Sequence, residues 1–326
     1  MFTYCGRQSP LLFIVLLFLL SSRDISAQAP PYGDLGIKKL PDTVLNRSAL
    51  IVPDPFNANR ALRRLFPGKW YDLGTRSGYK DQIINWICPT CKTAIYADAN
   101  MQDGDTVRFP YSDGVATRLI NVFSYTDSSG KRYKIMSFNH SAYDLDGIQS
   151  GRFSGGLLGM AKFIRIDSGW QLQIFQPAIG AYGSFSQAPA PTPILIGDRQ
   201  YAYMIDHVNG GPGGPFWQDN FLIAEVRGSY RQILSVVGTS RTASTDGRSS
   251  WKCTYAVVPG EKHSFQDIVF VIKGHYWGAD PEGLPAELNG KVKGNELGSF
   301  TITHTFSYSD KKGYQELRPA RVSIKR

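Results

Sequence analysis

Histidine and cysteine, the side chains that most often carry catalysis or hold metals, are scarce in this sequence. Its 326 residues include five His and four Cys. The G-x-S-x-G motif of many hydrolases does not occur, nor does a phosphate-binding loop that ends in Lys-Ser/Thr. Because catalytic triads assemble from distant segments, these absences remove only the local signatures, and the sequence identifies no catalytic residue.

Charged residues are also few, at 19%, whereas apolar residues make up 42% and aromatic residues 13%. The 33 Gly and 19 Pro supply many turn formers. This composition excludes a disordered chain and favours strands and turns over long helices. The length is sufficient for one large or two ordinary domains.

The sequence has one unbroken apolar run, Leu11 to Leu20, which follows Arg7. A membrane-spanning helix needs about 20 apolar residues, so this run is too short, but it has the length of a signal-peptide core. We predict a signal peptide over residues 1–27, cleaved near Ala27, and therefore a secreted or periplasmic protein. An uncleaved anchor is the alternative. No later segment is apolar enough to span a membrane, so we expect none in the mature chain.

Alternation of apolar and polar residues with period two runs through most of the chain. One example is KRYKIMSFN, in which Ile135 and Ser137 alternate with Met136 and Phe138. Such segments flank short turn sequences, among them 127–130, 167–168, 198–199, 227–229 and 310–313. The pattern predicts a mainly β fold of antiparallel hairpins in one or two sandwich- or barrel-like units, with a few short helices.

The predicted organisation is a signal peptide (1–27), an extended Pro-rich lead-in (28–56) and two β-rich domains (57–190 and 191–326). The boundary lies in SFSQAPAPTP, residues 184–193, because proline cannot donate to a sheet. A single domain crossed by this Pro-rich segment is the alternative. The segment NRALRRLF predicts a short helix, capped by Asn57 or Asn59 and ended by Pro67. Residues 151–163 fit either a short helix or a glycine-rich strand.

Three cysteines remain after signal cleavage: Cys88, Cys91 and Cys253. An exported protein meets oxidising conditions, so we expect a disulfide, either Cys88–Cys91 or a link from one of them to Cys253. Ile87 separates Trp86 from Cys88, which spoils the thioredoxin-like redox pattern. No second closely spaced pair completes a zinc site. We expect no metal and no cofactor.

The segment NGGPGGPFWQDN, residues 209–220, combines Gly-Pro punctuation with two aromatic residues. Long loops with aromatic and polar side chains commonly carry binding, although a cover over the core is the alternative. The predicted ligand-binding residues share this neighbourhood. They are Asp206, His207, Asn209, Phe216, Trp217, Gln218 and Asp219.

The net charge is +9, and falls to about +8 without residues 1–27, which hold two Arg and one Asp. A basic balance favours anionic polymers or membrane surfaces as partners, and solvation of the basic C-terminal tail is the alternative explanation. No nucleic-acid module is recognisable, so we expect no nucleic acid partner. The sequence leaves the oligomeric state open.

One short segment resembles a known family. LFPGKWYDLG, residues 65–74, is similar to the G-x-W-Y opening of lipocalin barrels through Gly68, Trp70 and Tyr71, including the short helix before it. The resemblance covers ten residues and implies the first strand of a barrel-like domain, with Trp70 closing the barrel floor.

We therefore expect a non-enzymatic exported module that binds carbohydrate or another surface polymer, or that has a structural role. Two alternatives remain open. One is a secreted hydrolase acting on glycan or ester, and the other is a lipocalin-like carrier of a small apolar ligand.

Overall fold

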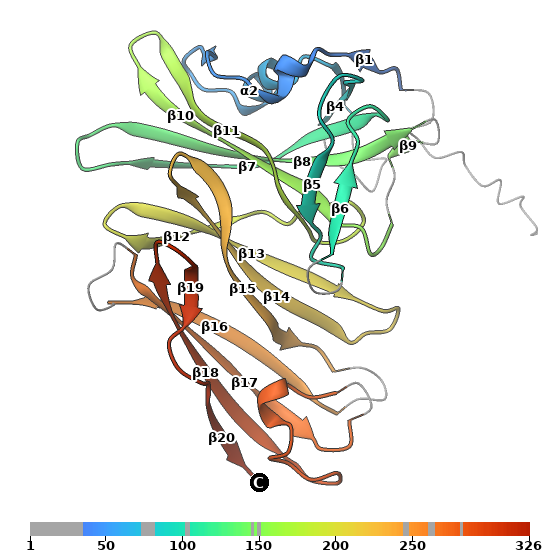
Figure 1. The fold of residues 1–326 in the computed structure, drawn as a ribbon, viewed down its shortest axis with the longest axis vertical. Coiled ribbons are helices and arrows are strands. Elements are labelled where there is room, and N and C mark those ends of the chain that lie inside the picture. The colour runs from blue at the N-terminus through green and yellow to red at the C-terminus, as the bar shows by residue number, and fades with distance from the viewer. Residues whose placement is uncertain are drawn as a thin grey trace, which may run out of the picture.

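The computed structural model describes residues 35–72, 82–101, 105–144, 147–148, 151–243, 248–259, 265–280 and 283–326. The predicted signal peptide lies outside these residues. Two large sheets of mostly antiparallel strands make up the molecule, so the predicted mainly β fold is confirmed. In Figure 1 the first sheet lies above the second, and the C terminus is at the lower end.

The first sheet has the order β1-β4-β7-β8-β10-β11-β2, with β3 paired to β4 and β9 to β8. Its strands are β1 (Lys38–Lys39), β2 (Ile51–Val52), β3 (Lys69–Asp72), β4 (Gln82–Ile87), β7 (Val115–Thr126), β8 (Arg132–Asp144), β9 (Gly147–Ile148), β10 (Gly156–Ile166) and β11 (Gly169–Tyr182). The helices η1 (Asp42–Leu45) and α2 (Ala58–Leu65) and a small sheet of β5 (Ala94–Ala97) and β6 (Thr106–Phe109) accompany it.

The second sheet runs in chain order from β12 to β19, with β20 paired to β18 beside β19. Its strands are β12 (Thr192–Gly197), β13 (Gln200–Gly210), β14 (Phe216–Val226), β15 (Ser229–Arg241), β16 (Ser250–Val258), β17 (Asp267–Trp277), β18 (Leu297–Ser309), β19 (Gly313–Glu316) and β20 (Arg321–Lys325), and a short helix, η3 (Ala286–Leu288), precedes β18. The predicted boundary at residue 190 falls between β11 and β12, where the chain passes from one sheet to the other.

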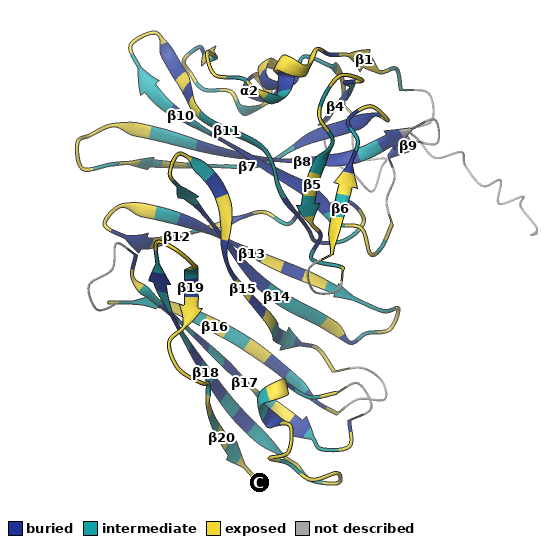
Figure 2. Cartoon of the chain, in the orientation of Figure 1, coloured by how far each residue is buried: buried dark blue, intermediate teal, exposed yellow. Residues whose placement is uncertain are grey.

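Both faces of the first sheet are buried in the middle of β8 and β10. On one face Met136 and Phe138 join the cluster that α2 covers. On the other face Ile135, Leu158 and Met160 pack against apolar side chains of the second sheet. A strand with two covered faces carries apolar residues on both, which explains why residues 156–161 show no clear alternation. Figure 2 shows the burial along these strands.

Several local predictions are confirmed. The five predicted turns join β7 to β8, β10 to β11, β12 to β13, β14 to β15 and β18 to β19. Helix α2 has Asn57 as its cap, with the Asn57 side chain accepting from the Arg60 N–H at 2.8 Å. The uncertain segment 151–163 is mostly strand β10, and Gly156 and Gly159 there permit close backbone approach.

Two predictions need correction. The alternating segment that follows the 310–313 turn is not one strand but is broken into β19 and β20, with Pro319 in the gap, since proline cannot donate to the ladder. The lipocalin resemblance placed Trp70 in a barrel floor, but 37% of Trp70 is exposed, and the Arg63 guanidinium lies 5.2 Å from its ring centre. The sheet around β3 does not close over it.

Candidate functional site

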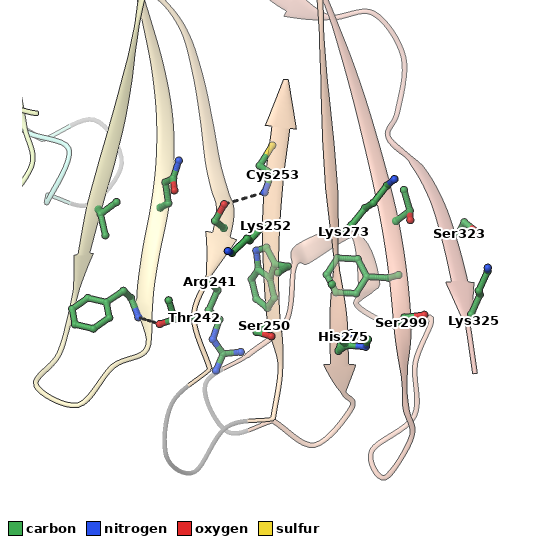
Figure 3. Close-up of a pocket in the computed structure, with 18 residues that line it drawn as sticks. Arg241, Thr242, Ser250, Lys252, Cys253, Lys273, His275, Ser299, Ser323 and Lys325 are labelled. Atoms are coloured by element: carbon green, nitrogen blue, oxygen red, sulfur yellow. Dashed lines mark hydrogen bonds between the residues drawn. The ribbon is translucent and has the colours of Figure 1, made fainter. Parts of the chain in front are cut away.

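A hollow with a volume of about 750 Å³ lies on the second sheet. Seven strands, from β13 to β18 together with β20, contribute to its lining (Figure 3). We call it the basic groove. Its lining residues are Val208, Phe216, Gln218, Ser240, Arg241, Thr242, Ser250, Trp251, Lys252, Cys253, Lys273, Gly274, His275, Ser299, Phe300, Thr301, Ser323 and Lys325.

Two rows of directly paired residues cross β16, β17, β18 and β20 in the floor of this groove. Side chains paired across strands point to the same face of a sheet, so each row forms a line of neighbouring groups. The first row is Ser250, His275, Ser299 and Lys325, and the second is Lys252, Lys273, Thr301 and Ser323. Trp251 and Phe300 lie between the rows, and their side chains are buried in an apolar cluster on the opposite face.

The charge of the groove has one sign. Lys252 and Lys273 are direct cross-strand partners and both are exposed, and Lys325 lies on the neighbouring row. Like charges directly opposite each other destabilise a sheet. None of the described residues that line the groove is an Asp or Glu, so no carboxylate among them offsets these lysines. An anion between the ammonium groups would remove the repulsion.

Hydroxyl groups surround the lysines. Six of the lining residues carry one: Ser240, Thr242, Ser250, Ser299, Thr301 and Ser323. Each hydroxyl can both donate and accept a hydrogen bond. This floor therefore suits a ligand that presents hydroxyl groups as well as anions.

The β13–β14 side of the groove is apolar at its surface. Val208 is 43% exposed and Phe216 is 42% exposed. The Phe216 N–H donates to the Thr242 hydroxyl oxygen at 2.9 Å, which holds the end of β14 next to the chain leaving β15. A ligand lying on the lysines would thus meet an accessible aromatic ring on one side.

A buried ion pair supports the groove from behind. Arg241 and Asp280 have fully buried side chains, with Nη2 and Oδ1 3.0 Å apart. The guanidinium lies 5.0 Å from the Trp217 ring and 5.4 Å from the Trp251 ring. Asp280 Oδ2 also accepts from the backbone N–H groups of Arg248 and Ser249. These contacts fix β14, β15 and β16 where they border the hollow.

The predicted binding residues are on strands and not on a long loop, which corrects the prediction for residues 209–220. The segment is a hairpin, in which Gly210 pairs with Phe216 and Val208 pairs with Gln218. Because alternate residues face opposite sides, the structure brings only Phe216 and Gln218 of the predicted set into the groove. Trp217 packs against Trp251, with ring centres 5.5 Å apart, and is half-buried.

The remaining predicted residues make structural contacts. His207 is buried and its Nδ1 accepts from the Gly183 N–H at 2.8 Å, and burial lowers its pKa. Asp219 accepts from the Gly238 N–H at 2.6 Å, and burial raises its pKa. The Asn209 side-chain amide donates a hydrogen bond to the side-chain oxygen of Asn100, which follows β5. Asp206 is exposed and lines a neighbouring hollow.

Sequence reasoning missed the basic residues of the floor. Lys252 and Lys273 come from the consecutive strands β16 and β17, and Lys325 comes from the last strand, β20. The available signal was weak: each lysine occupies a polar position of an alternating strand, where lysine is common. Only the strand pairing makes them neighbours.

Cysteine chemistry is limited to one disulfide among the described residues. Cys88 and Cys91 are joined, and Cys253 is a free thiol that packs against apolar clusters on the face opposite Lys252. Burial raises the pKa of Cys253 to about 11, so the thiol is neutral and poorly nucleophilic near pH 7. This is the reverse of what a reactive cysteine requires.

Comparison with protein-family models, curated proteins and solved structures found no match to this chain. The groove is therefore interpreted from its own chemistry.

Within the described part of the chain, no group of three or more metal-ligating side chains is close enough to hold an ion. No helix of that part has the length and apolar character needed to cross a membrane.

Proposed function

We propose that this protein is an exported, non-enzymatic binding module and that its basic groove holds an acidic carbohydrate polymer. The observation that carries the proposal is the direct pairing of Lys252 with Lys273 on an exposed face, with Lys325 two strands away from Lys273. A sheet that binds nothing gains no advantage from placing like charges opposite each other. Departures from local rules of this kind are expected at functional sites.

The other lining groups favour an acidic glycan over a small inorganic anion. Six hydroxyl side chains and the exposed ring of Phe216 surround the ammonium groups. A glycan presents hydroxyl groups that can bond to these side chains, and the apolar faces of its sugar rings can stack on Phe216. The volume of about 750 Å³ and the open form of the groove suit a chain that continues beyond it.

The test uses the protein from residue 28 onward and three acidic polymers: polygalacturonate, alginate and hyaluronan. Each is compared in calorimetric titrations with its own carboxyl-reduced, uncharged form. We expect at least one polymer to bind, more weakly as salt is added, and its reduced form to bind poorly. K252A/K273A should lower that affinity about a hundredfold, because two charge-assisted contacts are lost and each is worth on the order of 1.5 kcal/mol.

The matched control is K311A/K312A. It removes the same charge from the turn between β18 and β19, outside the groove, and should leave the affinity nearly unchanged. The proposal is wrong if none of the three polymers is preferred to its reduced form, or if the two double variants weaken binding equally.

A further inference from the structure

A turn that follows β11, at the end of the first sheet, holds two residues in an unfavourable backbone conformation. Phe185 and Ser186 have φ angles of 54° and 55°, in the left-handed region that favours glycine. The Gln187 N–H donates to the Ser184 carbonyl oxygen at 3.0 Å and closes the turn. Asn and Gly are the usual residues where both central positions need positive φ, and this chain has Phe and Ser there.

The surroundings fix this turn firmly. The Phe185 N–H donates to the Gly151 carbonyl oxygen at 3.0 Å, and the Ser186 N–H donates to that of Ser154 at 2.8 Å. The Ser186 carbonyl oxygen accepts from the buried side chains of Asn139 and Ser141, at 3.0 and 2.8 Å. Strain that the structure maintains in this way is often found at binding sites.

The result is an accessible aromatic ring beside a second hollow. Phe185 is 47% exposed, and the hollow has a volume of about 420 Å³. We call it the Phe185 hollow. Its lining residues are Gly183, Ser184, Phe185, Gln187, Ala188, Pro189, Asp206 and Val208. Val208 also lines the basic groove, so the two hollows meet at this residue.

The two hollows differ in the charge of their lining side chains. Among the described residues that line the Phe185 hollow, the only charged side chain is Asp206, which accepts from Asn220 Nδ2 at 2.5 Å. A carboxylate disfavours a ligand anion nearby but accepts hydrogen bonds from hydroxyl groups. The Phe185 end therefore suits an uncharged, hydroxylated ring, whereas the lysine end suits anions.

We infer that the basic groove and the Phe185 hollow form one extended site for a linear glycan that carries both acidic and uncharged sugar units, and that Phe185 contacts an uncharged unit. This inference rests on the proposed function and adds the length and composition of the ligand. From Val208 on β13 to Lys325 on β20 the path crosses six strand steps, or about 29 Å at ~4.8 Å per step. A single sugar cannot cover this distance.

Hyaluronan oligosaccharides test the inference, because acidic and uncharged units alternate along them. A short oligosaccharide that fits within the basic groove is compared with one longer than the path of about 29 Å. The variant is F185G, which removes the ring. Glycine readily adopts the positive φ angle of this position. F185G should weaken the long oligosaccharide about tenfold and leave the short one unchanged.

Two controls separate the ring from the fold. S186G relieves the same turn but keeps Phe185, and F153A removes a ring that is 61% exposed on the neighbouring loop. Both should bind the long oligosaccharide as the unchanged protein does. The thermal midpoint of F185G, measured beside these titrations, should be no lower than that of the unchanged protein.

Failure of this inference is distinguishable from failure of the proposed function. If K252A/K273A abolishes binding and F185G changes the affinity for neither oligosaccharide, the extended site is wrong and the proposal for the basic groove stands. If F185G lowers the affinity for both oligosaccharides equally, Phe185 does not contact the far end of the long one, and this result also rejects the extended site. If single-stranded DNA of similar length binds more tightly than hyaluronan and with the same dependence on Phe185, the glycan assignment is wrong.

Discussion

At the scale of single residues, the basic groove depends on a side chain that a ligand would hardly touch. Arg241 is fully buried, pairs with Asp280, and has its guanidinium over the rings of both Trp217 and Trp251. A buried ion pair is a weak source of net stability, but removing one partner leaves an uncompensated buried charge. The main role of the pair is therefore to hold the Trp217 and Trp251 rings in place behind the groove.

We predict that D280A lowers the free energy of unfolding by about 3–5 kcal/mol, because the Arg241 charge stays buried without its partner. Denaturant titration monitored by tryptophan fluorescence measures this. The control is D198A, which breaks an ion pair with Arg199 at the surface, where the Asp198 side chain is 95% exposed. It should cost about 0–1 kcal/mol. Equal losses in the two variants would show that the buried pair has no special role.

At the scale of strands, the pairing of β16 with β17 favours binding of an anion but destabilises the ligand-free sheet. Lys252 and Lys273 face each other across the two strands, and their repulsion is present whenever the groove is empty. The other two positions of their row carry Thr301 and Ser323, which suit a half-exposed strand without charge. The lysines are therefore costly to the empty sheet.

We predict that K273T raises the free energy of unfolding of the ligand-free protein by about 0.2–1 kcal/mol, while it weakens binding of the acidic polymer. A double-mutant cycle provides the control, because adding K252T to K273T should bring little further stabilisation once the repulsion is gone. If K273T destabilises the ligand-free protein, the lysine has a structural role that the strand pairing does not reveal.

At the scale of the whole molecule, the two large sheets share apolar packing. Tyr203, Ile205 and Phe221 of the second sheet lie in one buried cluster with Leu158 and Met160 of the first. The Lys162 ammonium on β10 also lies 2.8 Å from the Glu225 carboxylate on β14. Contacts of this kind favour unfolding of the two sheets together.

We predict that residues 191–326 expressed alone expose this cluster and self-associate, whereas the chain from residue 28 onward unfolds in one calorimetric transition. Light scattering and binding of an apolar dye report on the fragment. A monomeric fragment with its own cooperative transition would contradict this prediction and would support two independent domains with a boundary near residue 190.

Local chemistry made much of the architecture predictable. Asp127 to Gly130 and Asp310 to Gly313 contain turn-forming residues between alternating segments, and both join strands as predicted. Asn57 precedes a helical segment and caps it. These features depend on neighbours a few residues apart, which a sequence displays directly.

The candidate site was less predictable for a physical reason. Phe216 and Gln218 were found because aromatic and polar residues next to glycine and proline suggest binding, but the same pattern included Trp217 and His207, which make structural contacts. The face of a strand to which a side chain points depends on register, and register depends on partner strands distant in the sequence.

The sequence by itself determined the mainly β class, most hairpins, and a net positive charge, because period-two alternation, turn residues and composition are local properties. Only the tertiary structure decided that Cys88 bonds to Cys91 and not to Cys253, that Lys252 and Lys273 are opposed, and that the basic groove and the Phe185 hollow share Val208. The choice of disulfide partner, the register between β16 and β17, and the approach of residues 183–189 to β13 depend on the packing of the whole chain.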